Sequence, residues 1–289
     1  MNVPFNVNPY TSKIRPLSNI ILFLIVVMAT FYPLASALFF GKTVNESLDS
    51  RKVLGSHTTQ ASTQDSGVFR NGVVSITFDD GWESTYENGV PILNTHNYKA
   101  TFYVLSNFFD DLQYMSLAQV KSLQSQGHTI GSHTVSHPHL TDLNETDMNY
   151  EVVGSQKQLE SKLGPIKDFA APYGDLDDSV IGVIKEHYNS HRTVAAGINT
   201  FENFDRYRLK SPNIQVNTSN DEIKTFLDEA KSHNGWLILT YHEINDSGRE
   251  YSISKEQFAE QMKLIEDSGL KVALLPDVLK EITRVYGTP

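Results

Sequence analysis

The sequence predicts a single α/β domain, a closed barrel of parallel strands, behind an N-terminal hydrophobic segment. From Val73 onward, short apolar runs alternate with amphipathic stretches of ten residues or more, which implies parallel strands joined by helical crossovers. Seven such units in about 215 residues suit a closed barrel better than an open sheet. The chain shows no internal repeat and no second domain.

The elements follow one another in a regular order. Strands are expected at Val73–Phe78, Ala100–Leu105, Thr129–Ser132, Asp168–Ala171, Thr193–Ala195, Trp236–Tyr241 and Val272–Leu275. Helices are expected from Ser116 to about Gly127 and over Glu145–Leu163, Asp177–His187, Asn220–Ser232, Ser254–Asp267 and Pro276–Tyr286. The first of these helices opens with Ser116 and Gln119, at the spacing of a capping box.

The N-terminus predicts export of the domain. Residues 1–37 combine Lys13 and Arg15 with a long uncharged stretch and the sequence Ala35-Ser36-Ala37, a pattern typical of a cleaved signal peptide. Because residues 17–40 are also long enough to span a bilayer, an uncleaved membrane anchor is the alternative. Residues 38–70 predict a flexible linker, and residues 71–289 the domain. We therefore expect an extracytoplasmic protein, secreted or membrane-anchored.

The net charge and the cysteine content exclude several classes of binding partner and of metal site. The net charge is −10, and without Lys13 and Arg15 the rest of the chain carries −12. Such an acidic body argues against nucleic acid or anionic lipid and favours a neutral polymer or a small molecule. The chain has no cysteine, which excludes disulfides and thiolate metal sites. No protein partner is predicted, and the membrane is expected to contact only the N-terminal segment.

Two adjacent aspartates, Asp79 and Asp80, end the first apolar run. Burying both carboxylates costs several kcal/mol unless something compensates. A solvent-exposed turn is one explanation. The other is a catalytic site in which one carboxylate binds a cation and the other accepts a proton.

Four histidines lie within twelve residues, at positions 128, 133, 137 and 139. His133 and His137 are four residues apart, so a helical turn or a tight loop can aim both imidazoles at one point. A polar surface loop is the alternative. Together with one aspartate they would form a two-histidine, one-carboxylate metal site with positions left open for water and substrate. The second aspartate could then take the proton of an attacking water.

Two more polar clusters follow predicted strands. Pro172-Tyr173-Gly174 predicts a turn whose backbone N–H could stabilise an oxyanion, although such a tripeptide is more often a simple turn. His242 follows the apolar run Trp236–Tyr241 and could protonate a leaving group from across the barrel mouth. A satisfied core histidine is the alternative.

These motifs resemble those of the polysaccharide deacetylases of NodB-homology type, carbohydrate esterase family 4, over about residues 70–286. TFDDG (77–81) and HTVSH (133–137) match the first two family motifs. APYG (171–174) resembles part of the third, and LTYH (239–242) resembles the fifth with one residue of altered spacing.

The resemblance implies a distorted (β/α)7 barrel and a hydrolase of carbon–nitrogen bonds other than peptide bonds. The substrate would be the N-acetyl groups of an exported polysaccharide: peptidoglycan, a chitin-like polymer or poly-N-acetylglucosamine. One divalent metal is implied, with zinc expected first and cobalt or another metal as alternatives. The implied roles are Asp79 as general base, His242 as general acid, Asp80, His133 and His137 as metal ligands, and the Tyr173 N–H as oxyanion donor.

Two departures from the family pattern leave other functions open. Ala170 occupies the position where the family usually has an arginine that pairs with the base, and residues 201–210 lack the tryptophan of the fourth motif. We expect Arg206 or Arg208 to replace the missing arginine. The alternatives are an O-acetyl-glycan esterase, a small-molecule amidase or deformylase, and a weakly active glycan-binding protein.

Overall fold

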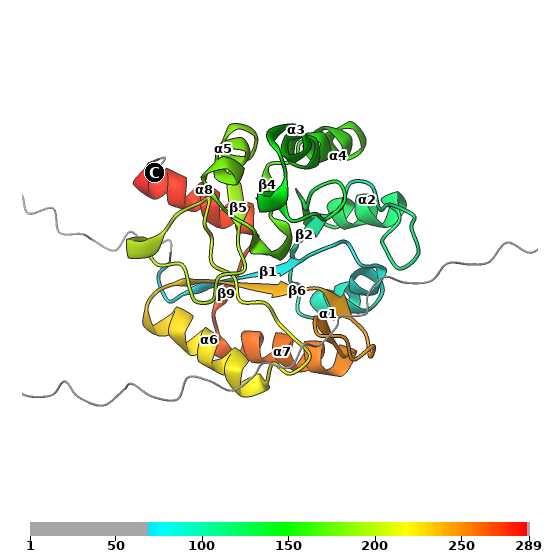
Figure 1. Ribbon diagram of the computed structural model, residues 1–289. Coiled ribbons are helices and arrows are strands. Elements are labelled where there is room, and N and C mark those ends of the chain that lie inside the picture. The colour runs from blue at the N-terminus through cyan, green and yellow to red at the C-terminus, as the bar shows by residue number, and fades with distance from the viewer. Residues whose placement is uncertain (1–68, 288–289) are drawn as a thin grey trace, which may run out of the picture. The chain divides into compact units, whose positions relative to one another are not determined.

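A sheet of parallel strands with helices packed on its outside forms the part of the chain that the computed structural model describes, residues 69–287 (Figure 1). The predicted signal peptide or anchor and the predicted linker up to residue 68 lie outside the described residues. Phe69, which the sequence placed in the linker, is buried against the domain. Between residues 69 and 287, no helix combines the length and apolar character needed to cross a membrane.

The main sheet has seven strands in the order β5-β4-β3-β2-β1-β6, with β9 also paired to β1. Every pairing in it is parallel. A short pair, β7 with β8, lies outside this sheet. The strands are β1 (Val73–Phe78), β2 (Thr101–Val104), β3 (Thr129–Ser132), β4 (Asp168–Ala170), β5 (Ser190–Arg192), β6 (Trp236–Tyr241), β7 (Glu243–Ile244), β8 (Ser252–Ile253) and β9 (Lys271–Val272).

Both faces of β1 are buried, as expected for a central parallel strand. Val74, Ile76 and Phe78 point into the main apolar core under the helices. The alternate positions, Ser75 and Thr77, carry small polar groups that bond to neighbouring strands. Because side chains alternate along a strand, the polar face continues to Asp79.

An irregular segment bridges the two outer strands β5 and β6. Leu209 forms a parallel bridge with Arg192 of β5, and Asn213 forms one with Thr240 of β6. The backbone bonds Thr193 N–H to Leu209 O and Ile214 N–H to Thr240 O continue this bridge at 2.9 and 2.8 Å. The distorted (β/α)7 barrel that the family resemblance implied is therefore confirmed, with this segment in place of a full ladder on one side.

The helices cover the outside of the sheet, with α6 and α7 packed against each other below β1 and β6 in Figure 1. The segment from Glu145 to Leu163 is continuously helical and contains a π-helical turn at Tyr150–Gly154. The helices are α1 (Val90–Thr95), α2 (Leu117–Ser125), α3 (Glu145–Asn149), α4 (Ser155–Leu163), α5 (Asp178–His187), α6 (Asn220–Ser232), α7 (Lys255–Ser268) and α8 (Leu275–Tyr286).

The predicted elements agree with the structure in most places. The capping box at Ser116 and Gln119 is present, with both reciprocal hydrogen bonds. The strand predicted at Thr193–Ala195 is wrong by three residues, because β5 is Ser190–Arg192. The helical segment Thr85–Thr95 was not predicted.

Candidate active site

The polar clusters meet at one end of the sheet because its strands are parallel and their carboxyl ends lie at one edge. Asp79 and Asp80 follow β1, and His133 follows β3. Tyr173 follows β4, and His242 follows β6.

Asp80, His133 and His137 form a compact set of ligand atoms, all within 4.8 Å of one another. The Nε2 atoms of His133 and His137 lie 3.3 and 3.2 Å from Oδ1 of Asp80. His133 is buried, while Asp80 and His137 keep one side toward the barrel mouth. This is the two-histidine, one-carboxylate arrangement that the sequence predicted.

The contacts around these three residues fit a cation. Nδ1 of His133 lies 2.7 Å from the Ala170 carbonyl, so Nδ1 carries the proton and Nε2 presents a lone pair. Oδ2 of Asp80 accepts a hydrogen bond from the Trp82 indole at 2.8 Å, whereas its buried Oδ1 accepts none within residues 69–287. Two imidazole nitrogens and a carboxylate oxygen therefore converge on one point, as metal ligands do.

The electrostatics of the cluster also favour a positive charge. Burial alone would raise the pKa of Asp80, but contact with His133 and His137 outweighs it and holds that pKa well below its usual range. Burial alone would lower the pKa of His133, but the carboxylates of Asp79 and Asp80 outweigh it and raise that pKa. The two aspartates thus draw in positive charge, which a proton or, more strongly, a divalent cation can provide.

Several residues at the site hold a backbone conformation that side chains other than glycine rarely adopt. The φ angles are +69° at Asp80, +75° at Thr134, +65° at His137 and +59° at Tyr173. Each such residue costs on the order of 1–3 kcal/mol, and such residues cluster at functional sites.

A buried carboxylate supports the turn between the two histidine ligands. Glu151 accepts hydrogen bonds from the backbone N–H groups of Val135 and Ser136, both at 2.9 Å, and from the Ser136 hydroxyl at 2.7 Å. The His137 N–H donates to the Thr134 hydroxyl at 3.0 Å. The sequence analysis did not find Glu151, which lies on a helix 14 residues beyond the second ligand.

Asp79 is paired with Arg192, which corrects the expectation that Arg206 or Arg208 would replace the missing arginine. The Arg192 guanidinium is fully buried and lies 2.5 Å from both carboxylate oxygens of Asp79. Arg206 instead bonds to Thr283, and Arg208 to Asp205.

The register of the sheet explains this replacement. Ala170 on β4 is paired with Arg192 on β5. Paired residues on neighbouring strands project from the same face. The arginine expected at position 170 is therefore supplied from the adjacent position on the next strand, and it still reaches Asp79.

The register of β1 with β6 brings Asp79 and His242 together. Phe78 is paired with Tyr241, and the Asp79 N–H bonds to the Tyr241 carbonyl at 2.9 Å. Nε2 of His242 lies 3.9 Å from Oδ2 of Asp79, and the ring packs against Tyr251. Burial lowers the pKa of His242.

Tyr173 lies beside the ligand set. Its ring stacks on His139 with centroids 3.8 Å apart and meets the His137 ring edge-on at 4.7 Å. Asp175 contacts Nδ1 of His139 at 2.9 Å and so ties this turn to the histidine loop. Residues 201–210, where the fourth motif of the family would carry a tryptophan, contain none. The two tryptophans of the chain are Trp82 and Trp236, and the buried indole of Trp236 donates to Ser75.

Comparison with known proteins agrees with this fold. Residues 66–189 match the polysaccharide deacetylase family model, in agreement with the family resemblance of the motifs. Among curated relatives, a chitooligosaccharide deacetylase of Azorhizobium caulinodans is 34% identical over 116 residues, covering 39% of this chain and 53% of the relative. A peptidoglycan-N-acetylglucosamine deacetylase of Bacillus cereus is 32% identical over 113 residues, covering 38% and 40%.

The solved structure of the T48 deacetylase with substrate resembles the chain with a TM-score of 0.54 at 20% identity, covering 73% of this chain and 92% of that one. At this identity the likeness shows the fold alone. The matches with the two curated relatives span about half of their length or less.

Proposed function

We propose that the protein is a metal-dependent hydrolase that removes N-acetyl groups from the amino sugars of a polysaccharide outside the cytoplasm. The observation that carries this proposal is the position of Asp79. It lies next in sequence to the ligand Asp80, is bound by Arg192, and is 3.9 Å from His242. A base, an acid and a set of metal ligands thus lie within one barrel mouth.

The residues divide the chemistry of amide hydrolysis among them. A divalent cation held by Asp80, His133 and His137 would supply Lewis acidity, polarising the acetyl carbonyl and activating a water. Asp79, oriented by Arg192, would accept the proton of the attacking water. The backbone N–H of Tyr173 would donate to the oxyanion of the tetrahedral intermediate. His242 would protonate the departing amine, which completes cleavage of the carbon–nitrogen bond.

The substrate and the compartment are supported by different observations. Two similar proteins are named for deacetylation of chitooligosaccharide and of peptidoglycan N-acetylglucosamine, which supports an N-acetylated polysaccharide as the substrate. The uncharged N-terminal stretch supports export. The lack of an arginine at position 170 was the one feature that favoured a weakly active glycan-binding protein, and Arg192 removes it.

The test is acetate release from N-acetylglucosamine oligomers by the full chain, before and after chelation and with Zn²⁺ or Co²⁺ restored. Asp79→Asn should abolish metal-dependent release. Asp228→Asn, the same change at an exposed position on α6, should leave it intact. If folded protein with a bound metal released no acetate from any N-acetylated glycan, the proposal would be wrong.

A further inference from the structure

Trp82 follows the Asp-Asp-Gly sequence directly, and none of the steps above uses it. Its indole N–H donates to Oδ2 of Asp80 at 2.8 Å. The other oxygen, Oδ1, is the one that faces both histidine nitrogens. We propose that Trp82 is a positioning residue for the metal site, and that its N–H fixes which oxygen of Asp80 is presented to the metal. The inference deepens the proposed function, on which it rests for the presence of a metal at Asp80.

The indole is held firmly enough to act as such a support. On one side its ring stacks on Tyr114, with centroids 4.6 Å apart and planes 18° from parallel. The backbones of the two residues form an antiparallel bridge. The Glu83 N–H bonds to the Gln113 carbonyl, and the Met115 N–H to the Gly81 carbonyl, both at 2.8 Å. Trp82 and Tyr114 are therefore held against each other through both their rings and their backbones.

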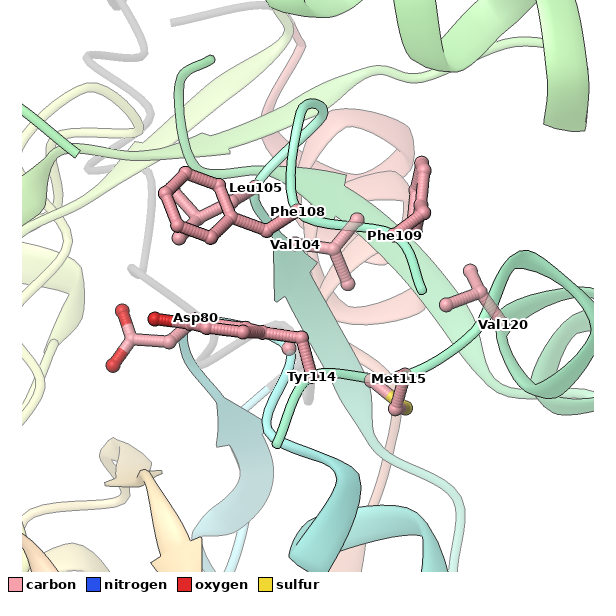
Figure 2. Close-up of a pocket in the computed structure, with 9 residues that line it drawn as sticks. Asp80, Val104, Leu105, Phe108, Phe109, Tyr114, Met115 and Val120 are labelled. Carbon is pink, nitrogen blue, oxygen red and sulfur yellow. The ribbon is translucent and has the colours of Figure 1, made fainter. Parts of the chain in front are cut away.

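Tyr114 in turn belongs to an apolar wall beside Asp80. Figure 2 shows the Asp80 carboxylate at the edge of a pocket in which the rings of Tyr114 and Phe108 lie on either side. These two rings are in contact, with centroids 4.9 Å apart. Burial and the nearby carboxylate of Asp80 raise the pKa of Tyr114 to about 12, so its hydroxyl stays neutral. A hydrogen bond to Asp80 is stronger in such surroundings than in water.

The indole has a second partner besides Tyr114. The Arg249 guanidinium lies over it, 5.2 Å from the ring centroid, and forms an ion pair with Glu243, which follows His242. The ring of Trp82 is thus in contact with both the Tyr114 ring and the Arg249 guanidinium. Its directed contact with the site is therefore the N–H bond to Asp80.

The need for such a bond follows from the geometry of Asp80. A carboxylate has two equivalent oxygens, and rotation about its last bond exchanges them. A donor fixed on one oxygen removes this freedom, and a charge-assisted bond also favours the ionised form that a metal needs. Loss of an outer contact of this kind typically weakens metal binding by about 10- to 100-fold.

The test measures metal affinity rather than turnover. The full chain and its Trp82→Phe variant are stripped with a chelator, and their affinity for Zn²⁺ is measured by competition with a chromophoric chelator. Trp236→Phe is the matched control, because it removes an indole N–H that donates to Ser75 at 2.9 Å away from the ligands. Thermal unfolding of the metal-free proteins is measured alongside.

We expect Trp82→Phe to bind Zn²⁺ about 10- to 100-fold more weakly, with little change in the melting temperature of the metal-free protein. Trp236→Phe should do the reverse, losing stability and keeping its affinity. If Trp82→Phe kept both its Zn²⁺ affinity and its stability, the indole N–H would not position Asp80. If it lost only stability, Trp82 would be a packing residue. Both results would overturn the inference, and neither depends on whether the protein deacetylates glycans.

Discussion

Replacing Arg192 by alanine should abolish the proposed deacetylase activity and destabilise the fold together. Arg192 is fully buried and is the partner of a buried carboxylate, at 2.5 Å from both oxygens of Asp79. Two unit charges about 4 Å apart attract by about 4 kcal/mol at the effective dielectric constant that suits protein sites. Truncating one member of a buried ion pair costs about 3–5 kcal/mol, because the other charge is left uncompensated. The two estimates agree.

The loss can be measured in two ways. Urea unfolding should show a free energy of unfolding about 3–5 kcal/mol lower for Arg192→Ala. The value of kcat/KM for acetate release should fall as well, because the Asp79 carboxylate loses the guanidinium that orients it. Arg192→Lys, which keeps the charge, should retain more of both properties.

A double variant separates the charge from its position. Since Ala170 and Arg192 are paired across β4 and β5, Ala170→Arg combined with Arg192→Ala places the guanidinium on the neighbouring strand. It should recover activity relative to Arg192→Ala alone. If Arg192→Ala itself changed neither the unfolding free energy nor kcat/KM, the account of Asp79 given above would be refuted.

Three further predictions concern the support of the site and the core. Glu151→Gln should weaken Zn²⁺ binding about tenfold and speed hydrogen exchange over residues 133–137, and unchanged exchange would show that the carboxylate does not hold this loop. Gly131→Ala should cost about 1–3 kcal/mol in thermal unfolding, because a Cβ there would lie 2.4 Å from the Tyr103 ring, whereas Gly182→Ala, a helix position with open space, should be stabilising. Burial lowers the pKa of His191 to about 4, whereas the pKa in the unfolded chain is near 6.5. Between these values the unfolded chain binds a proton that the folded protein does not. The free energy of unfolding should therefore fall by about 2 kcal/mol from pH 7 to pH 5. An equally steep decline in His191→Gln would contradict that assignment.

Local signals in the sequence predicted most of the fold. Helix α6 was predicted with its observed bounds, since it has a capping box at Ser219 and an amphipathic pattern. The helical segment Thr85–Thr95 was missed because it begins with a π-helical turn and carries few apolar residues. Strand β5 was placed too late because Ser190 and Arg192 are polar and buried, and the apolar residues come after them.

The sequence predicts those site residues that lie close together in a motif. It does not predict those that only the pairing of strands brings to the site. The Asp79-Asp80 pair and the histidine loop have recognisable spacing. Arg192 has none, because its closeness to Asp79 depends on strand order and on the register of β4 with β5, which sequence alone does not reveal. Trp82 and Glu151 likewise belong to no motif. They are recognised only by their contacts with Asp80 and with the histidine loop.

The position of β1 in the chain has a consequence for how the domain folds. This first strand pairs along its whole length with β6, about 160 residues later, so its largest set of backbone bonds forms only after most of the chain is available. Contacts so distant in sequence make folding slow. Residues 66–189, which carry the family match, end before β5, β6 and β9. Expressed alone, that segment would lack Arg192 and His242 and would leave β1 with an open, aggregation-prone edge.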